Sequence, residues 1–454
     1  MFEQEEQRDE LLEKIEDLIS RKRYAELRDL LLPLEAQDIA GLFMELDDKV
    51  PMVFRLLPKE QAAEVFVELD SEEQEVLIQS FSNTELKEVL DELYLDDAVD
   101  IVEEMPANVV KRILRHADPD VRKSINEILK YPDDCAGSIM TTEYVDLKAT
   151  MTVGDALKRI RRTGPDKETI NICYVIDEGR HLLGYLSIRT ILLSEEDDVV
   201  GDIMDTHVIS ANTLDDQEDV AQTLNKYDFL ALPIVDTENR LVGIVTVDDA
   251  MDVLTEAAAE DLSIMAAVTP DEKPYFAASA WEHARHRVVW LLILMLSAAI
   301  TGSIITRYED AISAVPLLVA FLPMLMDTGG NCGSQSATLV IRGLALEEIR
   351  PRDALRVIRK ELAVAAIVSA VLAAANGLRI YLQYHDSAIA LVISLSLAAT
   401  VVLAKLVGCM LPIAAKQLHM DPAIMASPLI TTIVDAGAVL IYFQAAAALL
   451  RLPV

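Results

Sequence analysis

SPLITTIVDAGAVLIYF, residues 427–443, is an apolar stretch that contains a single carboxylate, Asp435. It lies in a longer apolar segment, from about Ala423 to Leu450. A helix needs roughly 20 residues to cross about 30 Å of hydrocarbon, so this segment is long enough to span a membrane. A charge at bilayer depth costs roughly 2.5 to 3.5 kcal/mol on insertion scales, so it normally faces a cavity or an ion path. The alternative is a hydrogen bond to a neighbouring helix. The segment therefore predicts a membrane span with a polar site.

Four more segments upstream have the length and apolar character of membrane spans. They run over about 288–306, 311–337, 362–382 and 388–413. Together with the last segment they predict an all-α transmembrane domain of five helices over residues 281–454. Five is an odd number, so the two termini are expected on opposite sides of the membrane.

The distribution of basic residues sets the expected orientation, because Lys and Arg near span ends stay in the cytosol. Arg285 and Arg287 precede the first span. The loop between the second and third spans holds Arg342, Arg350, Arg352, Arg356, Arg359 and Lys360. We therefore expect a multi-pass protein of the cell (plasma) membrane, with a cytosolic N-terminus and an extracytosolic C-terminus.

The first 280 residues are strongly acidic. They hold 27 Lys/Arg against 64 Asp/Glu, whereas residues 281–454 hold 13 against 11. This balance argues against nucleic acid as a partner, because phosphates need Lys and Arg. Residues 1–132 read as short amphipathic helices, and Leu46-Asp47 recurs as Leu69-Asp70. This recurrence at a regular interval predicts stacked helices in an acidic α-helical superhelix.

Residues 133–250 contain a duplication, with copies at about 137–200 and 201–250. Met140 matches Met204, and Gly184 matches Gly243. Each copy is predicted to run helix, strand, turn, strand, helix, because β-rich apolar runs such as 173–176 and 232–235 follow amphipathic stretches. The pattern resembles a tandem pair of CBS domains, an α/β regulatory module. An Ala- and Glu-rich helix follows, and we expect residues 251–280 to link the pair to the first span.

The second span carries MDTGGNCGSQSATLVIRGLA, residues 326–345. With the fifth-span carboxylate and this domain order, the whole chain resembles the MgtE family of magnesium transporters. The resemblance implies a homodimeric Mg²⁺ channel or transporter for uptake down the electrochemical gradient, closed by intracellular Mg²⁺. Its transported and regulatory ion would be Mg²⁺, and Asp435 would bind the hydrated ion in the pore.

The glycine-rich run of the second span has two interpretations. Three glycines in five residues disfavour a regular helix, so a broken helix that lines the pore is favoured. Close packing of helices through small residues is the alternative. The predicted pore-lining residues are Gly329, Gly330, Asn331, Gly333 and Gln335. Asp327 is a further acid beside them, for which the family motif assigns no role.

The resemblance also implies Mg²⁺ sites between the cytosolic domains. The matching positions in the helical domain are Glu64, Asp96 and Asp100. In and just after the CBS pair they are Ser138, Glu218, Asn225, Asp228, Asp249 and Asp252, with Ser138 and Asn225 contributing backbone carbonyls. On the linker helix they are Glu260 and Asp261, and Asp421 matches in the loop before the last span. Ala257 stands where a further acid is expected, which weakens one site.

Nucleotide binding is a further property of CBS modules. Phe229 fits an adenine-stacking position. Thr190 stands where a ribose-binding Asp is expected, and Ile172 replaces an aromatic residue. We therefore expect at most a weak site for ATP.

Three other functions compete with magnesium uptake. The first is CBS-regulated transport of another divalent cation such as Co²⁺ or Mn²⁺, or export in place of uptake. The second is a membrane-tethered nucleotide sensor without conduction, against which the intramembrane Asp435 argues. The third is an enzyme, but the sequence shows no catalytic triad, zinc motif or phosphate-binding loop. We therefore expect a protein that is not an enzyme.

Overall fold

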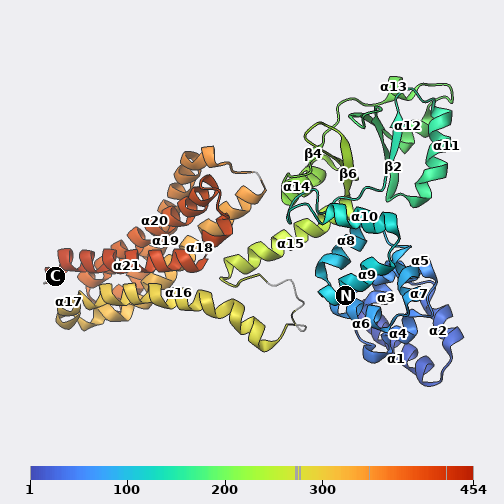
Figure 1. Cartoon of the computed structure of the whole chain (residues 1–454). Coiled ribbons are helices and arrows are strands. Elements are labelled where there is room, and N and C mark those ends of the chain that lie inside the picture. The colour runs from blue at the N-terminus through green and yellow to red at the C-terminus, as the bar shows by residue number, and fades with distance from the viewer. Residues whose placement is uncertain (1, 271–274, 276–277, 347, 426, 453–454) are drawn as a thin grey trace. The chain divides into compact units, whose positions relative to one another are not determined.

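The computed structural model describes residues 2–270, 275, 278–346, 348–425 and 427–452. It divides into two compact units, Met1–Leu254 and Thr255–Val454, and each is described by itself (Figure 1). The first unit holds the acidic helices and the duplicated α/β module. The second holds the long apolar helices.

A succession of short helices forms the first part of the first unit. They are α1 (Phe2–Ser20), α2 (Tyr24–Leu31), α3 (Ala36–Phe43), α4 (Val50–Phe54), α5 (Lys59–Val67), α6 (Ser71–Ser80), α7 (Asn83–Leu90), α8 (Leu95–Glu104), α9 (Ala107–His116) and α10 (Pro119–Ile128), with a 3₁₀ turn η1 (Asp47–Lys49) after α3. Helix α3 packs on α5, α5 on α7, and α7 on α9, so alternate helices stack. The echoed residues Leu46 and Leu69 are both buried in the shared core. The predicted superhelix of amphipathic helices is confirmed.

The α/β module consists of two copies with the same sheet. The first contains β1 (Tyr144–Lys148), α11 (Val153–Thr163), the 3₁₀ turn η2 (Gly164–Asp166), β2 (Thr169–Ile176), β3 (Leu182–Ser187) and α12 (Ile188–Leu193). After α13 (Val200–Ile203), the second contains β4 (Ala211–Asn212), α14 (Gln217–Tyr227), β5 (Ala231–Val235), β6 (Leu241–Thr246) and α15 (Val247–Met265). In each copy the first strand is parallel to the second, and the third is antiparallel to it. The order of helix, two strands and helix is confirmed, and β1 and β4 are strands that the prediction missed.

The two copies contact each other through residues at equivalent positions of the duplication. A methyl group on Gly184 would lie 2.9 Å from the sulfur of Met204, and one on Gly243 would lie 2.8 Å from the sulfur of Met140. Each glycine thus leaves room for the methionine of the other copy. An antiparallel backbone bridge between Tyr185 and Asp205 also joins the two copies.

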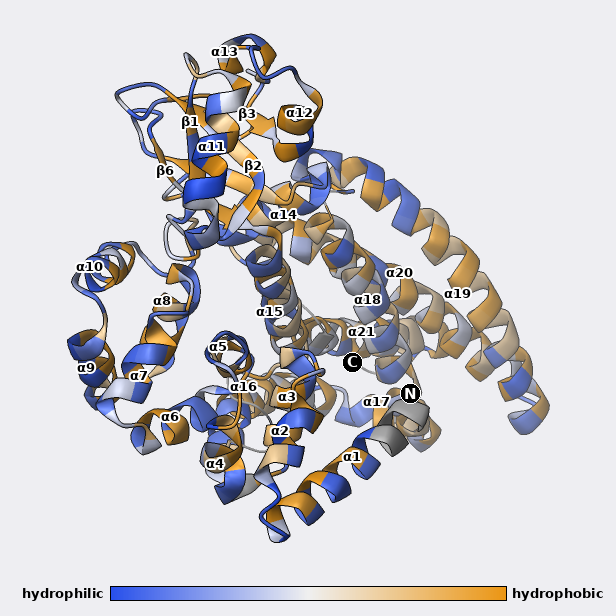
Figure 2. Ribbon diagram, turned by 90° about the vertical axis from the view of Figure 1, so that its right-hand side faces the viewer, coloured by the Kyte–Doolittle hydropathy of each residue, from blue (hydrophilic) through white to orange (hydrophobic). Residues whose placement is uncertain are grey.

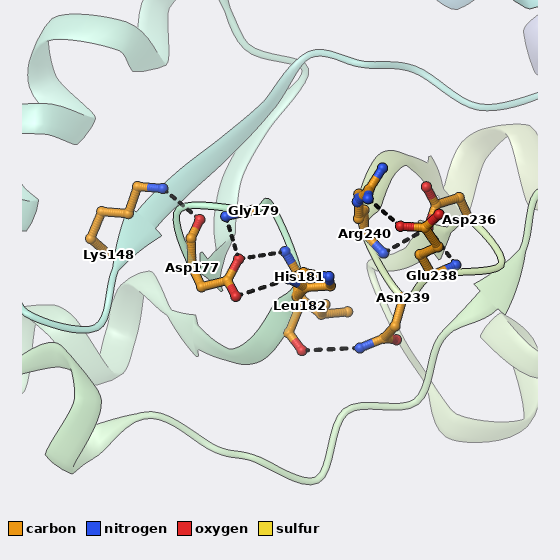
Figure 3. A network of polar contacts seen from close by, with 9 residues as sticks. All are labelled: Lys148, Asp177, Gly179, His181, Leu182, Asp236, Glu238, Asn239 and Arg240. Atoms are coloured by element: carbon orange, nitrogen blue, oxygen red, sulfur yellow. Dashed lines mark hydrogen bonds and ion pairs between the residues drawn. The ribbon is translucent and has the colours of Figure 1, made fainter.

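The hairpin turns of the two copies repeat the duplication in detail (Figure 3). Oδ1 of Asp177 accepts hydrogen bonds from the backbone N–H groups of Gly179 and His181, at 2.7 and 2.9 Å. Oδ1 of Asp236 accepts the equivalent bonds from Glu238 and Arg240, both at 2.9 Å. The same aspartate therefore closes the same turn in each copy.

Helix α15 contains the boundary that we predicted between the CBS pair and the linker, after residue 250. Ala250 and Val253 are buried in the core of the second copy, so the first turns of α15 belong to that fold. The helix ends at Met265, less than two turns after the acidic pair Glu260 and Asp261 begins. The predicted linker segment continues to residue 280, but 271–274, 276 and 277 lie outside the described residues.

The second unit is built from long helices that pack side by side. They are α16 (Ala280–Thr306), α18 (Leu322–Ala345), α19 (Ala354–Tyr384), α20 (Ser387–Gln417) and α21 (Ser427–Leu450), joined by α17 (Glu309–Ala314) and the 3₁₀ turns η3 (Pro316–Phe321), η4 (Pro351–Asp353) and η5 (Pro422–Met425). Helix α18 packs against α20 and α21, α19 against α20, and α16 against α21. Predominantly apolar ribbons mark α19 and α20 in Figure 2.

Four of the described helices in this unit are long and apolar enough to cross a membrane, namely α16, α19, α20 and α21. Helix α18 is not among them, because polar residues such as Asp327, Asn331 and Gln335 lower its apolar character. The second span also begins later than predicted, at Leu322 instead of about Ala311, since α17 and η3 occupy the intervening residues.

Candidate functional site

Helix α18 carries a row of polar side chains along one exposed face. Asp327, Asn331 and Gln335 follow each other at intervals of four residues, and all three are exposed in the single chain. Residues four apart lie on the same face of a helix, about one turn above each other. The exposed polar row therefore extends over at least two turns of a helix that otherwise packs among apolar neighbours.

Asp435 lies on α21, the helix beside α18, and is half-buried. Asp327 is the charged group that acts on its carboxylate, so the two carboxylates lie within range of mutual repulsion. A pair of carboxylates next to a polar row is an unfavourable arrangement against lipid, since each charge at bilayer depth costs several kcal/mol. Hard oxygen ligands of this kind suit Mg²⁺, which keeps several of its waters when bound.

The glycines of the predicted pore-lining run lie on the other face of α18, and the favoured broken-helix interpretation is wrong. Helix α18 continues through the run without a break, and Gly329, Gly330 and Gly333 are buried. A methyl group on Gly329 would lie 2.8 Å from side-chain atoms of Thr400 and Val434. The alternative of close helix packing describes these glycines, because only a hydrogen side chain fits between α18, α20 and α21.

Helices α18 and α20 approach each other closely at Gly333 and Gly408. A methyl group on Gly408 would overlap the carbonyl oxygen of Gly333. The backbones of α18 and α20 therefore touch at this point. The tight crossing holds the glycine face inward, which leaves Asn331 and Gln335 on the outward face.

The first unit contains a cluster of carboxylates around the start of α8. Asp96 is buried, with 7% of its surface exposed. Burial, followed by repulsion from Asp97, raises the pKa of Asp96 to about 7. Burial and the charges of Asp249 and Asp248 raise the pKa of Asp97 to about 7. Burial and repulsion from Asp96 do the same for Asp249, also to about 7. The pKa values of these neighbouring carboxyl groups are raised partly because their ionised forms repel one another.

Two more members lie at the edges of the cluster. Burial and the charge of Asp96 raise the pKa of Glu168 to about 8. Asp100 is exposed to solvent at the outer edge. The protein around its carboxyl and repulsion from Asp249 nevertheless raise its pKa to about 8. The cluster thus joins residues from the helical domain, the CBS pair and α15.

Four cluster residues were missed by the sequence reasoning. Asp97 and Asp248 precede or follow predicted acids directly, so adjacency was the available signal. Glu143 and Glu168 precede the paired strands β1 and β2, and the N–H of Glu168 donates to the carbonyl of Glu143 at 2.9 Å. Only the parallel pairing of these strands brings the two acids together, which no local pattern indicates.

The remaining predicted cytosolic ligands are more scattered. Glu64 is exposed on α5, and Glu68, the residue after the last residue of α5, is an acid that acts on Asp97. Burial and the charge of Asp248 raise the pKa of Asp252. Glu218 and Asn225 lie on α14, Asp228 is the C-cap of that helix, and Ser138 lies in the loop before β1. Across the described ranges, no three His, Cys, Asp or Glu side chains are arranged to hold a metal ion as they stand.

The second unit holds an acidic group of its own at the end of α15. Burial, with repulsion from Asp421 and Glu260, raises the pKa of Asp261. The Lys416 ammonium acts in the opposite direction. The structure therefore brings together the three acids that were predicted on the linker helix and in the loop before the last span.

The predicted nucleotide residue Phe229 stacks against a neighbour of its own chain. Its ring lies 5.4 Å from that of Tyr227, with the planes 16° apart. Phe229 also packs against the core of the second CBS copy. Thr190, at the ribose position, is exposed, and its hydroxyl lies 2.9 Å from that of Ser187.

Comparisons with known families match each region of the chain. Residues 34–134 match the MgtE intracellular N domain, residues 136–196 and 200–256 match CBS domains, and residues 322–445 match a divalent cation transporter domain named MgtE. Two solved structures match the cytosolic part. One is the cytosolic domain of the Mg²⁺ channel MgtE in complex with ATP, at 39% identity and a TM-score of 0.51 over 53% of this chain and 99% of that one. The other is the soluble part of a magnesium transporter, at 32% identity and a TM-score of 0.52 over 56% and 100%.

Relatives also match over the full length. The magnesium transporter MgtE of Thermus thermophilus is 38% identical over 430 residues, which cover 94% of this chain and 95% of the relative. That of Bacillus subtilis is 35% identical over 448 residues and 98% of both chains. With its CBS pair and apolar helices, the chain is a multidomain, multi-pass membrane protein. It belongs to the MgtE family of divalent cation transporters.

Proposed function

We propose that this protein carries Mg²⁺ into the cell through a path lined by the polar row of α18 and by Asp435. Full-length relatives from two bacteria bear the name magnesium transporter MgtE, which supports the ion. The main structural support is the exposed row of Asp327, Asn331 and Gln335 beside the half-buried Asp435. Side chains of this kind are stable at membrane depth when they face water or an ion instead of lipid.

A second copy of the chain would complete this path. In one chain the row is open, because no described helix of the second unit covers it. Two copies related by a two-fold axis would place two rows and two Asp435 carboxylates opposite each other. The homodimer therefore encloses the row and gives the ion oxygen atoms from two sides. The glycine face of α18 then serves to hold the row in place, not to line the path.

The membrane potential would drive the ion inward. With the N-terminus in the cytosol of the cell membrane and the C-terminus outside, a divalent cation gains about 4.6 kcal/mol per 100 mV of inside-negative potential. This gradient removes the need for nucleotide hydrolysis. The protein in this proposal is a transporter without enzymatic activity.

The acidic cluster of the first unit would sense internal Mg²⁺. Asp96, Asp97, Asp100, Glu168 and Asp249 repel one another when ionised. A hard divalent cation that binds among them cancels this repulsion, because carboxylate oxygens are its preferred ligands. The donors fit Mg²⁺ in chemical type, and a small rearrangement would bring them around one ion. Ion binding would therefore stabilise a compact arrangement of the helical domain, the CBS pair and α15.

The end of α15 would couple sensing to conduction. Met265 packs against an apolar cluster formed by α18, α20 and α21, and this cluster contains Cys332, the residue after Asn331. The acids Glu260 and Asp261 near Met265 approach Asp421. Mg²⁺ between them would hold α15 against the membrane helices and close the path. Loss of the ion would release the helix, which is a shift between two populations.

ATP would act as a weak modulator at most. A solved cytosolic domain of an MgtE channel contains ATP, which supports nucleotide binding in the family. In this chain the Phe229 ring is already stacked on Tyr227, and an adenine would have to displace that contact or add to it. Binding of ATP with a dissociation constant in the micromolar range would contradict this part of the proposal.

Growth of a strain that lacks its own Mg²⁺ uptake tests the proposed function. The wild-type protein is expected to restore growth at low external Mg²⁺, and Asp435→Ala is expected to abolish the rescue. Asp310→Asn is the matched control, because Asp310 is an exposed acid of α17 outside the row. Full rescue by Asp435→Ala at equal protein level would refute the assignment of Asp435. Uptake of Co²⁺ or Mn²⁺ without restored growth at low Mg²⁺ would reassign the ion.

A further inference from the structure

A buried ion pair lies inside the second unit, behind the polar row. Glu361 on α19 and Lys405 on α20 have 8% and 4% of their surface exposed. Nζ of Lys405 lies 4.0 Å from Oε2 of Glu361. The hydroxyl of Ser336 on α18, which is fully buried, donates to the same Oε2 at 2.6 Å. Three helices are therefore joined through one carboxylate.

The pair is placed to act on the helix that carries the row. Ser336 directly follows Gln335, the last member of the row, but is buried where Gln335 is exposed. The Lys405 ammonium acts electrostatically on Cys332, the residue after Asn331. Ala404, next to Lys405, approaches Gly333 through its carbonyl oxygen. The cation of Lys405 thus lies one helix away from the proposed path of Mg²⁺.

A buried ion pair is a weak source of stability, because well-packed apolar residues of similar size often serve as well or better. In a membrane the desolvation of both charges is still more unfavourable. Its presence between three packed helices therefore calls for a role other than cohesion. The carboxylate can play a role that apolar residues cannot, because it neutralises a positive charge next to a path for a divalent cation.

We propose that Glu361 is a positioning residue for Mg²⁺ passage, which neutralises Lys405 and holds α18 through Ser336. This inference rests on the proposed transport function. Without the carboxylate, the ammonium repels the ion across roughly 10 Å, the spacing of packed helices, and passage slows by about tenfold or more. Without the ammonium, the lone carboxylate attracts the ion instead of repelling it. The two charges are therefore unequal in their effect.

Mg²⁺ influx into proteoliposomes tests the proposal, with the full-length protein and its Glu361→Gln, Lys405→Met and doubly substituted forms. Glutamine keeps an oxygen that accepts from Ser336, and methionine keeps the length of the lysine side chain. Influx per folded protein is measured at a fixed inside-negative potential, and thermal unfolding in detergent reports stability separately. We expect Glu361→Gln to lose about tenfold in rate and Lys405→Met to lose less than about threefold. The double variant is expected to recover to within about threefold of wild type.

The outcomes separate charge neutralisation from cohesion. If the pair only holds helices together, both single variants lose stability equally and the double variant transports no better than the worse of them, which overturns the proposal. Normal influx through folded Glu361→Gln also overturns it. Should Glu361→Gln fail to fold, the neutral double variant decides alone: near-normal influx supports the proposal, and a folded but inactive protein contradicts it. Absent influx through the wild type is a different result, because it removes the proposed function itself.

Discussion

The acidic cluster predicts that removal of one buried charge stabilises the first unit when Mg²⁺ is absent. Asp96→Asn is the sharpest perturbation, because Asp96 is the most buried member and its carboxyl is opposed by Asp97 and Asp249. Asparagine keeps the oxygen that accepts the N–H of Asp97 at 3.1 Å. The substitution therefore removes charge with little change in shape or hydrogen bonding.

The size of the effect follows from the pKa. An unfolded aspartate has a pKa near 3.9, whereas burial and its neighbours raise that of Asp96 to about 7. The difference corresponds to about 4 kcal/mol at pH 8 as an upper limit, and we expect about half of it after relaxation. Below pH 4 the carboxyl is protonated in both states and the penalty vanishes. Stability of the unit therefore falls as pH rises from 4 through 7, and the gain from Asp96→Asn grows over the same window.

Hydrogen exchange of the α8 amides in the full-length protein measures this gain. At pH 8 without Mg²⁺, a gain of about 2 kcal/mol slows exchange of the variant by about 30-fold relative to wild type. Glu104→Gln is the control, because Glu104 is an exposed acid on the same helix, and it is expected to stay within about 0.5 kcal/mol of wild type. Millimolar Mg²⁺ should protect wild type and reduce the advantage of Asp96→Asn. Unchanged or faster exchange in Asp96→Asn at pH 8 would refute the reasoning.

Three further predictions concern packing, capping and coupling. Gly408→Ala is expected to lower the free energy of unfolding by about 2 kcal/mol or more in thermal melts, because its methyl group overlaps the opposing backbone, whereas Gly302→Ala, with open space around it, should be neutral or slightly stabilising. Glu85→Gln can keep the capping box with Ser82 but removes the charge that pairs with Arg55, and should cost up to about 1 kcal/mol in urea unfolding at pH 7. The Arg55 guanidinium and the N–H of Ser82 lower the pKa of the Glu85 carboxyl to about 2, so the difference should fade as pH drops from about 4.5 to 2. Met265→Ala removes the contact of α15 with the membrane helices and should weaken inhibition of influx by internal Mg²⁺ at least threefold, which equal inhibition curves for variant and wild type would contradict.

Much of the fold was predictable because it repeats. The matched pairs Met140 with Met204 and Gly184 with Gly243 turn out to be mutual contacts, so the duplication in the sequence recorded the interface between the copies. The short strands β1 and β4 were missed, since two to five residues of mixed polarity give little periodic signal.

The glycine run shows where local propensity fails. In water, three glycines in five residues disfavour a helix. In α18 the surrounding helices supply contacts that only glycine permits, and the helix continues through Gly329, Gly330 and Gly333. Tertiary packing thus decides the conformation there. The outward position of Asn331 and Gln335 follows from the same packing.

The membrane ion pair and part of the acidic cluster depend on contacts between distant segments. Lys405 lies within a predicted span, so its charge was a visible signal, but nothing in the sequence pairs it with Glu361. Glu143 and Glu168 meet the cluster only because β1 pairs with β2. Polar residues that are far apart along the chain and belong to no local motif cannot be paired from the sequence. Only the fold brings them together.

Voltage-driven Mg²⁺ influx into proteoliposomes tests the central claim most directly. The wild-type protein at an inside-negative potential is expected to admit Mg²⁺ faster as the potential grows, and Asp435→Asn should reduce the rate by at least about tenfold, because one charge-assisted interaction with the ion is lost on each copy. Asp310→Asn should match wild type. Influx that is equal in Asp435→Asn and wild type, or that ignores the potential, would contradict the account of Asp435 and the α18 row as the path of the ion.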